Sequence, residues 1–326
     1  MLDLNELKKE TAISSEKFDF TILTPLFMHG WQEVGDNGRG GRPVSRAVNA
    51  ELRGPSLRGI LRYWWRSLQK EGYSTAALLQ KEQAFFGGSS GGDKSGTRRS
   101  PLLLKISSLG NQALQETNKV ANLCPHKKPG MPSLTLLPGR KLRIELQVLK
   151  KDSGEYDLYV NYCKFTFMLA GFGQRSRRGA GAVQLDNFNW TTVQEFRKEL
   201  QEILQALHIE QEFNFQPQNT SCLLERRESK DPYPRLMRVW IGKMFKTAED
   251  ARFMLSEAGH VANPGNAPQM LGTARGGRQA SPLLGTVRQI GTAYYPLVSE
   301  MSNPQTVNPR YTVQRDIFLR TVGVSI

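Results

Sequence analysis

The stretch SLRGILRYWWRSLQK (Ser56–Lys70) predicts an amphipathic helix and is the starting point for the fold. Ser56 is a residue type that favours an N-cap position. The apolar positions that follow recur at helical spacing: they are Leu57, Ile60, Leu61, Trp64 and Leu68. A helix with one apolar face needs a second layer to cover that face.

The neighbouring segments predict four strands and a second helix. Four segments are predicted to be strands from their composition or from apolar–polar alternation: FDFTILTPL (Phe18–Leu26), SPLLLKISS (Ser100–Ser108), RKLRIELQVLK (Arg140–Lys150) and AVQLDNFN (Ala182–Asn189). The apolar run DLYVNYCKFTFMLAGF (Asp157–Phe172) predicts a buried helix, although its first half also fits a strand. The segment 35–54 is polar and rich in Gly and Arg, and is predicted to be a long loop.

The resulting order, β-α-β-β-α-β, predicts a ferredoxin-like fold, an α+β sandwich. In this fold, which RNA-recognition domains share, both helices cover one face of an antiparallel sheet and the other face is open. We expect this first domain at residues 18–190, after an N-terminal extension at residues 1–17. The remaining residues, 191–326, are predicted to form a second, degenerate ferredoxin-like domain.

The second half has a less regular pattern. It predicts helices at Thr191–Ala206, Tyr233–Phe245, Ala248–Ala258 and Arg315–Val322, and a hairpin over Ser281–Glu300 that turns near Gly291. Two short internal repeats suggest a duplication. A Gly-rich basic loop runs into Ser-Pro-Leu-Leu at Ser100 and again at Ser281, and a Pro-x-x-Arg pattern followed by Trp occurs in Pro55–Trp65 and Pro232–Trp240.

The charge of the chain indicates a polyanionic partner. Its 326 residues include 44 Lys and Arg against 30 Asp and Glu, a net charge of +14. Cationic side chains that neutralise phosphates release condensed counterions, so such a surface favours nucleic acid. No run approaches the roughly 18 apolar residues of a membrane span, and we expect a cytoplasmic protein without membrane contact. The three cysteines and four histidines lack ligand spacing, so no disulfide, metal or cofactor is expected.

The first candidate site is a cationic stripe on the predicted helix. Arg58, Arg62, Arg66 and Lys70 follow one another at intervals of four residues and fall on one side of it. Only Glu71 offers a carboxylate close in sequence, so the stripe is predicted to lack compensating charge. RNA phosphates or acidic protein side chains both fit it.

The second candidate site is the segment GFGQRSRRGAG (Gly171–Gly181). Its glycines include Gly173 and Gly179, and its three arginines are Arg175, Arg177 and Arg178. Glycines allow positive φ and a close approach of backbone N–H groups to phosphate, while arginines supply charge and a planar fork. We therefore predict an RNA-binding loop; the other interpretation is a flexible, solubilising turn.

The helix RGPSLRGILRYWWR (Arg53–Arg66), together with this Gly/Arg segment, resembles the RAMP proteins of CRISPR systems, in particular their type III-B (Cmr) members. The resemblance is strong over about residues 18–190. It implies tandem ferredoxin-like domains, no intrinsic nuclease activity and a place in an antiviral effector complex. The implied partners are other Cmr subunits and CRISPR RNA near its 3′ end, with target RNA as a further candidate. By motif match, Arg58, Arg62, Arg175, Arg177 and Arg178 would contact RNA or a neighbouring subunit.

Two other functions remain open from the sequence. One is a repeat-RNA endoribonuclease of the same superfamily, with His29 as the base, although no companion acid or base lies near it in sequence. The other is an assembly subunit whose basic face binds acidic neighbours and touches little RNA. The favoured prediction is a non-catalytic RNA-binding subunit.

Overall fold

The first sheet has four antiparallel strands. They are β1 (Ile13–Ile22), β5 (Leu102–Ser108), β9 (Lys141–Leu149) and β10 (Val183–Leu185), in the order β10-β1-β9-β5. With the helices α2 (Gly54–Leu68) and α4 (Tyr156–Leu169), the chain order is β-α-β-β-α-β. This computed structural model describes residues 13–29, 32–34, 44–46, 49–70, 72–88, 100–110, 114–116, 119–121, 132–149, 155–217, 220–227, 234–265, 269–273 and 279–326. The ferredoxin-like prediction is confirmed, and β1 includes residues 13–17 of the expected extension.

Smaller elements decorate this first unit. They are helix α3 (Thr75–Phe86) and three short strand pairs: β2 (Gln32–Val34) with β3 (Val44–Arg46), β4 (Ala50–Glu51) with β6 (Gln115–Glu116), and β7 (Lys119–Ala121) with β8 (Pro132–Leu134). The segment 35–54, predicted to be a loop, contains β3, β4 and the first residue of α2; its other residues lie largely outside the described ones.

Helix α3 was not predicted from the sequence, although both of its ends carry ordinary signals. The Ser74 side chain accepts a hydrogen bond from the Ala77 backbone N–H at 3.2 Å, and Gly87 ends the helix with φ 76°. The prediction for α2 was correct in position but wrong at its start. The N-cap is Arg53, not Ser56, because Pro55 with its fixed φ fits the first helical turn.

The second sheet has five antiparallel strands. They are β11 (Phe213–Phe215), β12 (Cys222–Arg226), β13 (Leu236–Ile241), β14 (Leu283–Ile290) and β15 (Ala293–Met301), in the order β11-β12-β13-β15-β14. The helices of this half are α5 (Val193–Ala206), the 3₁₀ turn η3 (Glu210–Glu212), α6 (Ala248–Val261) and α7 (Pro309–Thr321). The predicted helices α5, α6 and α7 and the β14–β15 hairpin around Gly291 are confirmed.

The second sheet explains why this half looks degenerate. The run β13-α6-β14-β15-α7 repeats the order of the first unit, and β13, β15 and β14 pair as its first, third and second strands do. The place of a fourth strand, next to β13, is taken by β12, which precedes β13 in the chain. Two sheets with this topology fit tandem ferredoxin-like units. The domain boundary at residue 190 stays a prediction.

The helix predicted at Tyr233–Phe245 is wrong, because this segment forms strand β13. β13 is a central strand, and it contributes Val239 to one hydrophobic core and Trp240 to the other. A strand buried on both faces loses its polar alternation, and its apolar residues then mimic helical spacing. The repeat that pairs Pro55–Trp65 with Pro232–Trp240 is therefore also wrong, since it aligns a helix with a strand.

The Ser-Pro-Leu-Leu repeat is structurally equivalent in the two halves. It leads into β5 in the first unit and into β14 in the second, which are the second strands of their units. In both places the serine hydroxyl accepts a hydrogen bond from the backbone N–H two residues ahead, at 3.3 Å for Ser100 and 3.1 Å for Ser281. The same local turn thus starts both strands.

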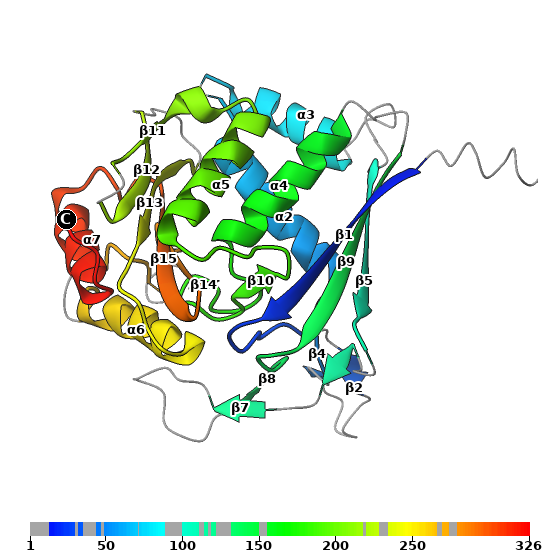
Figure 1. Cartoon of the computed structure of the whole chain (residues 1–326), viewed down its shortest axis with the longest axis horizontal. Coiled ribbons are helices and arrows are strands. Elements are labelled where there is room, and N and C mark those ends of the chain that lie inside the picture. The colour runs from blue at the N-terminus through cyan, green and yellow to red at the C-terminus, as the bar shows by residue number, and fades with distance from the viewer. Residues whose placement is uncertain are drawn as a thin grey trace, which may run out of the picture.

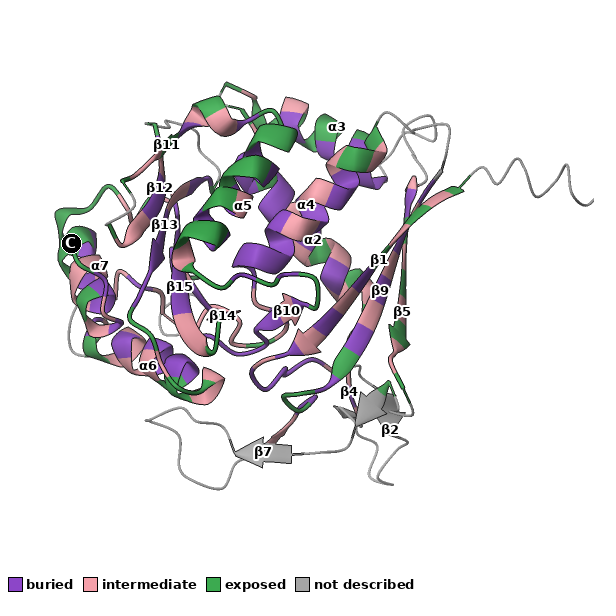
Figure 2. Cartoon of the chain, viewed as in Figure 1, coloured by how far each residue is buried: buried purple, intermediate pink, exposed green. Residues whose placement is uncertain are grey.

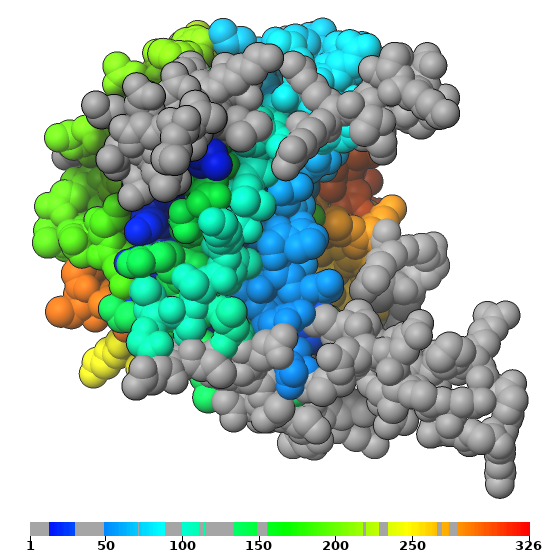
Figure 3. Space-filling model, turned by 90° about the vertical axis from the view of Figure 1, so that its right-hand side faces the viewer, coloured from blue at the N-terminus to red at the C-terminus, as the bar shows by residue number. Residues whose placement is uncertain are grey.

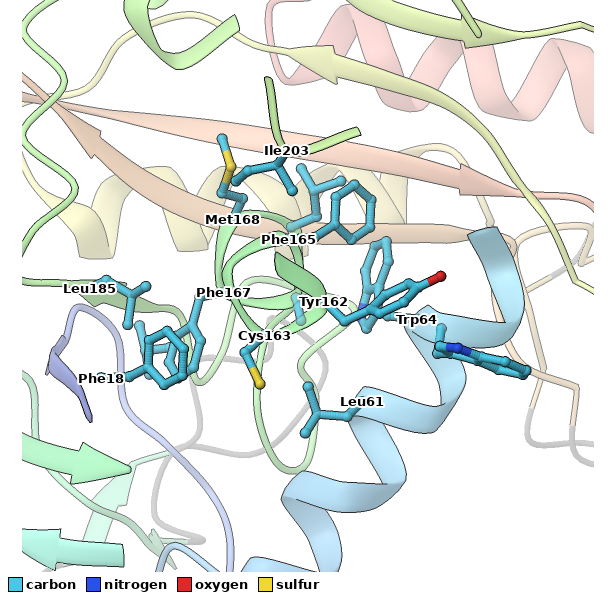
Figure 4. Close-up of a cluster of buried hydrophobic side chains, with 14 of the residues drawn as sticks. Phe18, Leu61, Trp64, Tyr162, Cys163, Phe165, Phe167, Met168, Leu185 and Ile203 are labelled. Atoms are coloured by element: carbon cyan, nitrogen blue, oxygen red, sulfur yellow. The ribbon is translucent and has the colours of Figure 1, made fainter. Parts of the chain in front are cut away.

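The elements stack in four layers (Figure 1). α2, α4 and α5 lie between the two sheets, and α6 and α7 cover the outer side of the second sheet. The run Asp157–Phe172 is apolar all round because α4 meets apolar neighbours on several sides, and Figure 2 shows it almost wholly buried towards its end. Figure 4 shows Phe165, Phe167 and Met168 of α4 projecting in different directions into this core, and Ile203 of α5 lies near Met168.

Two buried arginines of the second unit contact backbone carbonyls at the end of α4 and just beyond the end of α2. Arg288 of β14 is fully buried and donates hydrogen bonds to the carbonyls of Met168 and Ala170, each at 2.8 Å, and to Phe167 at the end of α4. Arg235 donates to the Lys70 carbonyl at 2.6 Å, just beyond α2. The carbonyls at the end of α4 have no partner within the helix and form the negative end of its dipole. The arginines therefore fix how the two units meet.

Candidate nucleic-acid interface

Two of the four cations of the stripe on α2 pair with a buried carboxylate, contrary to the sequence prediction. Glu82 of α3, which is 4% exposed, pairs with Arg62 at 3.3 Å and with Arg66 at 3.4 Å. Arg62 also donates to the Gly87 carbonyl at 2.5 Å, at the end of α3. The carboxylate was missed because α3 itself was missed. Arg62 therefore joins two helices, and its predicted contact with RNA stays a prediction.

Arg58 and Arg66 differ in their surroundings. Arg58 is half-buried, and its Nη2 donates to the Leu102 carbonyl at 3.0 Å, at the start of β5. Desolvation, followed by repulsion from Arg62, lowers the pKa of the Arg58 guanidinium. The side chain of Arg66 is 45% exposed. Figure 3 shows α2 and β5 next to each other on this side of the molecule, with α2 reaching the surface.

The Gly/Arg segment forms a tight turn between α4 and β10. Gly173, Arg175 and Gly179 all have positive φ, of 80°, 60° and 79°. A Cβ on Gly173 would lie 2.6 Å from the Phe27 carbonyl oxygen, and one on Gly179 would lie 2.8 Å from a methyl group of Leu255. The two glycines are thus required by backbone conformation and by close packing. The segment is not a flexible turn.

Two of its arginines reach the second unit. Arg177 donates to the Ser281 carbonyl, and the guanidinium of Arg178 donates to the Leu271 carbonyl at 3.4 Å. The backbone of the segment also pairs with β14: Gly179 N–H donates to the Gly285 carbonyl at 3.0 Å, and Gly285 N–H donates to the Arg177 carbonyl at 3.1 Å. The segment Gly171–Gly181 therefore joins the two units. The contact of its arginines with RNA stays a prediction.

A groove connects the two predicted sites. It lies between α2 and the Gly/Arg segment, and its lining includes Gly59, Tyr63, Arg177 and Leu284. The Arg177 guanidinium carbon lies 5.7 Å from the centre of the Tyr63 ring. The fold thus brings Arg177 to α2, and Tyr63 is a candidate that the sequence prediction did not single out. The available signal was the Arg-Tyr-Trp-Trp-Arg run, in which three aromatic residues stand between two arginines.

The open face of the first sheet has a different character. Its outward side chains pair with one another: Arg143 donates to Asp19 at 2.5 and 2.6 Å, and Lys141 contacts Asp186 at 3.0 Å. The hydrogen bond from Arg143 lowers the pKa of Asp19. None of the described strand residues facing outwards is aromatic. This face therefore lacks the rings on which sheet-type RNA-binding domains stack bases.

His29 lies beside the Gly/Arg segment, with its Nε2 3.2 Å from the side-chain nitrogen of Gln174. No group of three or more His, Cys, Asp or Glu residues among the described ones is arranged to hold a metal ion. Within the same described ranges, no helix has the length and apolar character of a membrane span. Glu71, the carboxylate that lies close to the stripe in sequence, is outside the described residues.

The fold and the family model define the class of this protein. The model of the RAMP superfamily matches residues 19–184, half of the chain. The chain belongs to the RAMP superfamily, as predicted from the motif on its helix and from its Gly/Arg segment.

Among solved structures, the chain is similar to Cmr1 from Pyrococcus furiosus in its apo form. The identity is 15%, the alignment covers 94% of this chain and 96% of that one, and the TM-score is 0.56. It also matches a chain in the structure of the Type III-B Cmr-beta complex bound to cognate target RNA, with 9% identity, 94% and 99% coverage and a TM-score of 0.49. No curated protein matches by sequence. The Cmr1 match shows that the two proteins share a fold over nearly their full lengths.

Proposed function

We propose that this chain is a non-catalytic RNA-binding subunit of a type III-B CRISPR effector complex. The observation that carries the proposal is the fold shared with Cmr1 over almost the whole of both chains, in a member of the RAMP superfamily. The net charge of +14 supports a polyanionic ligand. The ligand would be CRISPR RNA near its 3′ end, target RNA, or both, and the other partners would be Cmr subunits acting in cytoplasmic antiviral defence.

Isolated protein is expected to bind unstructured RNA with little sequence preference. Phosphate contacts predict that the logarithm of the binding constant falls linearly with the logarithm of salt concentration, by roughly 0.7 per phosphate contacted on a single strand. Fluorescence anisotropy on labelled RNA at a series of salt concentrations measures this slope. A flat response would refute phosphate binding and would favour the assembly function.

That assembly function has an observation of its own. Arg62, Arg177 and Arg178, three of the arginines predicted to contact RNA, make hydrogen bonds within the chain. They hold α3 and the second unit in place, which suits a subunit that mainly shapes a complex. The salt slope separates the two functions, because only the RNA-binding subunit gives a steep one.

The protein is expected not to cleave repeat RNA, with or without divalent cations. The expectation rests on the sequence around His29, which offers no companion acid or base close by, and the side chain of Gln174 beside it is an amide. Incubation with end-labelled repeat RNA, followed by gel analysis, tests it. Reproducible cleavage that His29→Ala abolishes would instead establish the endoribonuclease.

A further inference from the structure

No contact within the chain explains why residue 59 is a glycine. It lies in the interior of α2 with helical backbone, where glycine is less favourable than alanine. A Cβ at this position would have no heavy atom within 4 Å. The missing side chain therefore leaves open space on the outer side of the helix, and a molecule from outside can approach the α2 backbone there.

Gly59 also borders the groove between α2 and the Gly/Arg segment. The groove has a volume of about 240 Å³, below the roughly 300–1,000 Å³ of sites for drug-sized ligands, which suits a single ring. Its walls are the half-buried side chains of Ile60 and Tyr63 from α2, Arg177 from the segment and Leu284 from β14. All three elements belong to the described part of the chain, and the groove between them is already formed in this structure.

The chemistry of these walls matches a flat aromatic ligand. Tyr63 offers a ring, Arg177 offers a planar guanidinium beside it, and Ile60 and Leu284 are aliphatic. Unpaired nucleobases stack on such aromatic and guanidinium planes. The hydroxyls of Ser56 and Ser176 also line the groove, and because a hydroxyl both donates and accepts hydrogen bonds, either can satisfy the edge of any base.

Two arginines line a second groove on the other side of Gly59. The lining of this groove includes Arg58, Arg62 and Leu104. The two guanidiniums repel each other enough to lower the pKa of Arg58, on top of the larger effect of desolvation. An anion that arrives in this second groove would relieve that repulsion. The groove at Tyr63 thus suits a base, and the groove at Arg58 suits its phosphate; Gly59 borders both.

We propose that the groove at Tyr63 binds one unpaired base of a single-stranded RNA whose backbone crosses α2 at Gly59. The inference rests on the proposed RNA-binding function and deepens it by naming the contact. Base stacking is thereby assigned to this groove. It is not assigned to the open face of the first sheet, where the described strands present no aromatic ring.

The first test fills the space over Gly59. Gly59→Gln is expected to leave the melting temperature of the full chain unchanged or raised, because glutamine favours a helix and meets no neighbour. Its affinity for labelled oligouridylate should fall about tenfold or more, the scale of one lost stacked base. The matched control is Gly265→Gln, an exposed loop position that also has no atom within 4 Å of its Cβ, and it should bind like the wild type. Wild-type affinity in Gly59→Gln would overturn the crossing point.

The second test separates base from phosphate. Tyr63→Phe keeps the ring and should bind oligouridylate within about threefold of the wild type, whereas Tyr63→Leu should lose about tenfold. Both should bind an abasic oligonucleotide as the wild type does, with an unchanged salt slope. Equal losses on the two probes would overturn a base groove and point to a protein ligand or to general charge. If the wild type binds neither probe, the proposed function itself fails; if it binds and both Gly59→Gln and Tyr63→Leu match it, only this inference fails.

Discussion

Replacement of Arg288 by methionine is expected to lower the free energy of unfolding by about 3–5 kcal/mol, the usual cost of removing one side of a buried charged interaction. The Arg288 guanidinium donates hydrogen bonds to the carbonyls of Phe167, Met168, Ala170 and Val287 and to the Thr286 hydroxyl. Methionine keeps much of the volume but leaves the carbonyls at the end of α4 without a donor, at about 1–3 kcal/mol each. Thermal and urea unfolding followed by circular dichroism measure the loss.

The charge of Arg288 is balanced by the helix. Burial lowers the pKa of its guanidinium to about 9, so the side chain remains protonated at neutral pH. Within the described residues its five acceptors are four carbonyls and a hydroxyl, and none is a carboxylate. The negative end of the α4 dipole supplies the compensating field. Arg288→Lys keeps the charge but not the planar fork, and we expect it to lose stability to an intermediate extent.

The matched control is Arg310→Met, which removes an exposed arginine in the first turn of α7. This change should alter the free energy of unfolding by no more than about 0.5 kcal/mol, as surface substitutions usually do. A similarly small effect of Arg288→Met would contradict the role given to this residue. The units would then be held together by apolar packing alone.

Elements with one buried face could be predicted from their alternation alone. β9 alternates regularly because its outer side chains, such as Arg143 and Glu145, stay on the open side of the first sheet. β13 failed for the opposite reason, since helices cover both of its faces and no alternation remains. Local periodicity thus reports burial, and it identifies the type of secondary structure most directly where burial is one-sided.

The candidate site divides in a similar way. Local chemistry correctly placed the glycines of the Gly/Arg segment at positions of positive φ, and the RAMP motifs identified the family. The partners of the arginines were not predictable, because they come from distant positions: Ser281 lies 104 residues from Arg177, and Glu82 lies 20 residues from Arg62. An arginine-rich motif shows that anionic or carbonyl acceptors are needed, and only the fold shows which ones.

Replacing Arg175, Arg177 and Arg178 together with alanine is expected to weaken RNA binding by at least about tenfold and to make the salt slope less steep. Each arginine–phosphate contact is a charge-assisted hydrogen bond of roughly 1.5–3 kcal/mol before screening. The same variant should also be less stable than the wild type, because Arg177 and Arg178 hold the segment to the second unit. Binding titrations below the melting transition keep the two effects apart.

Two companion variants decide how the arginines act on RNA. Lysine at all three positions keeps the charge, so it should restore the salt slope if the contacts are with phosphates, and should fail if the planar guanidiniums are needed only to place the segment. Gly179→Val keeps every arginine but forces a β-branched residue to φ 79° and against Leu255, so it should displace the segment and weaken RNA binding through geometry alone. If the triple alanine protein binds RNA as the wild type does, the segment only joins the two units, and the RNA path must be sought at Arg58 and Arg66 instead.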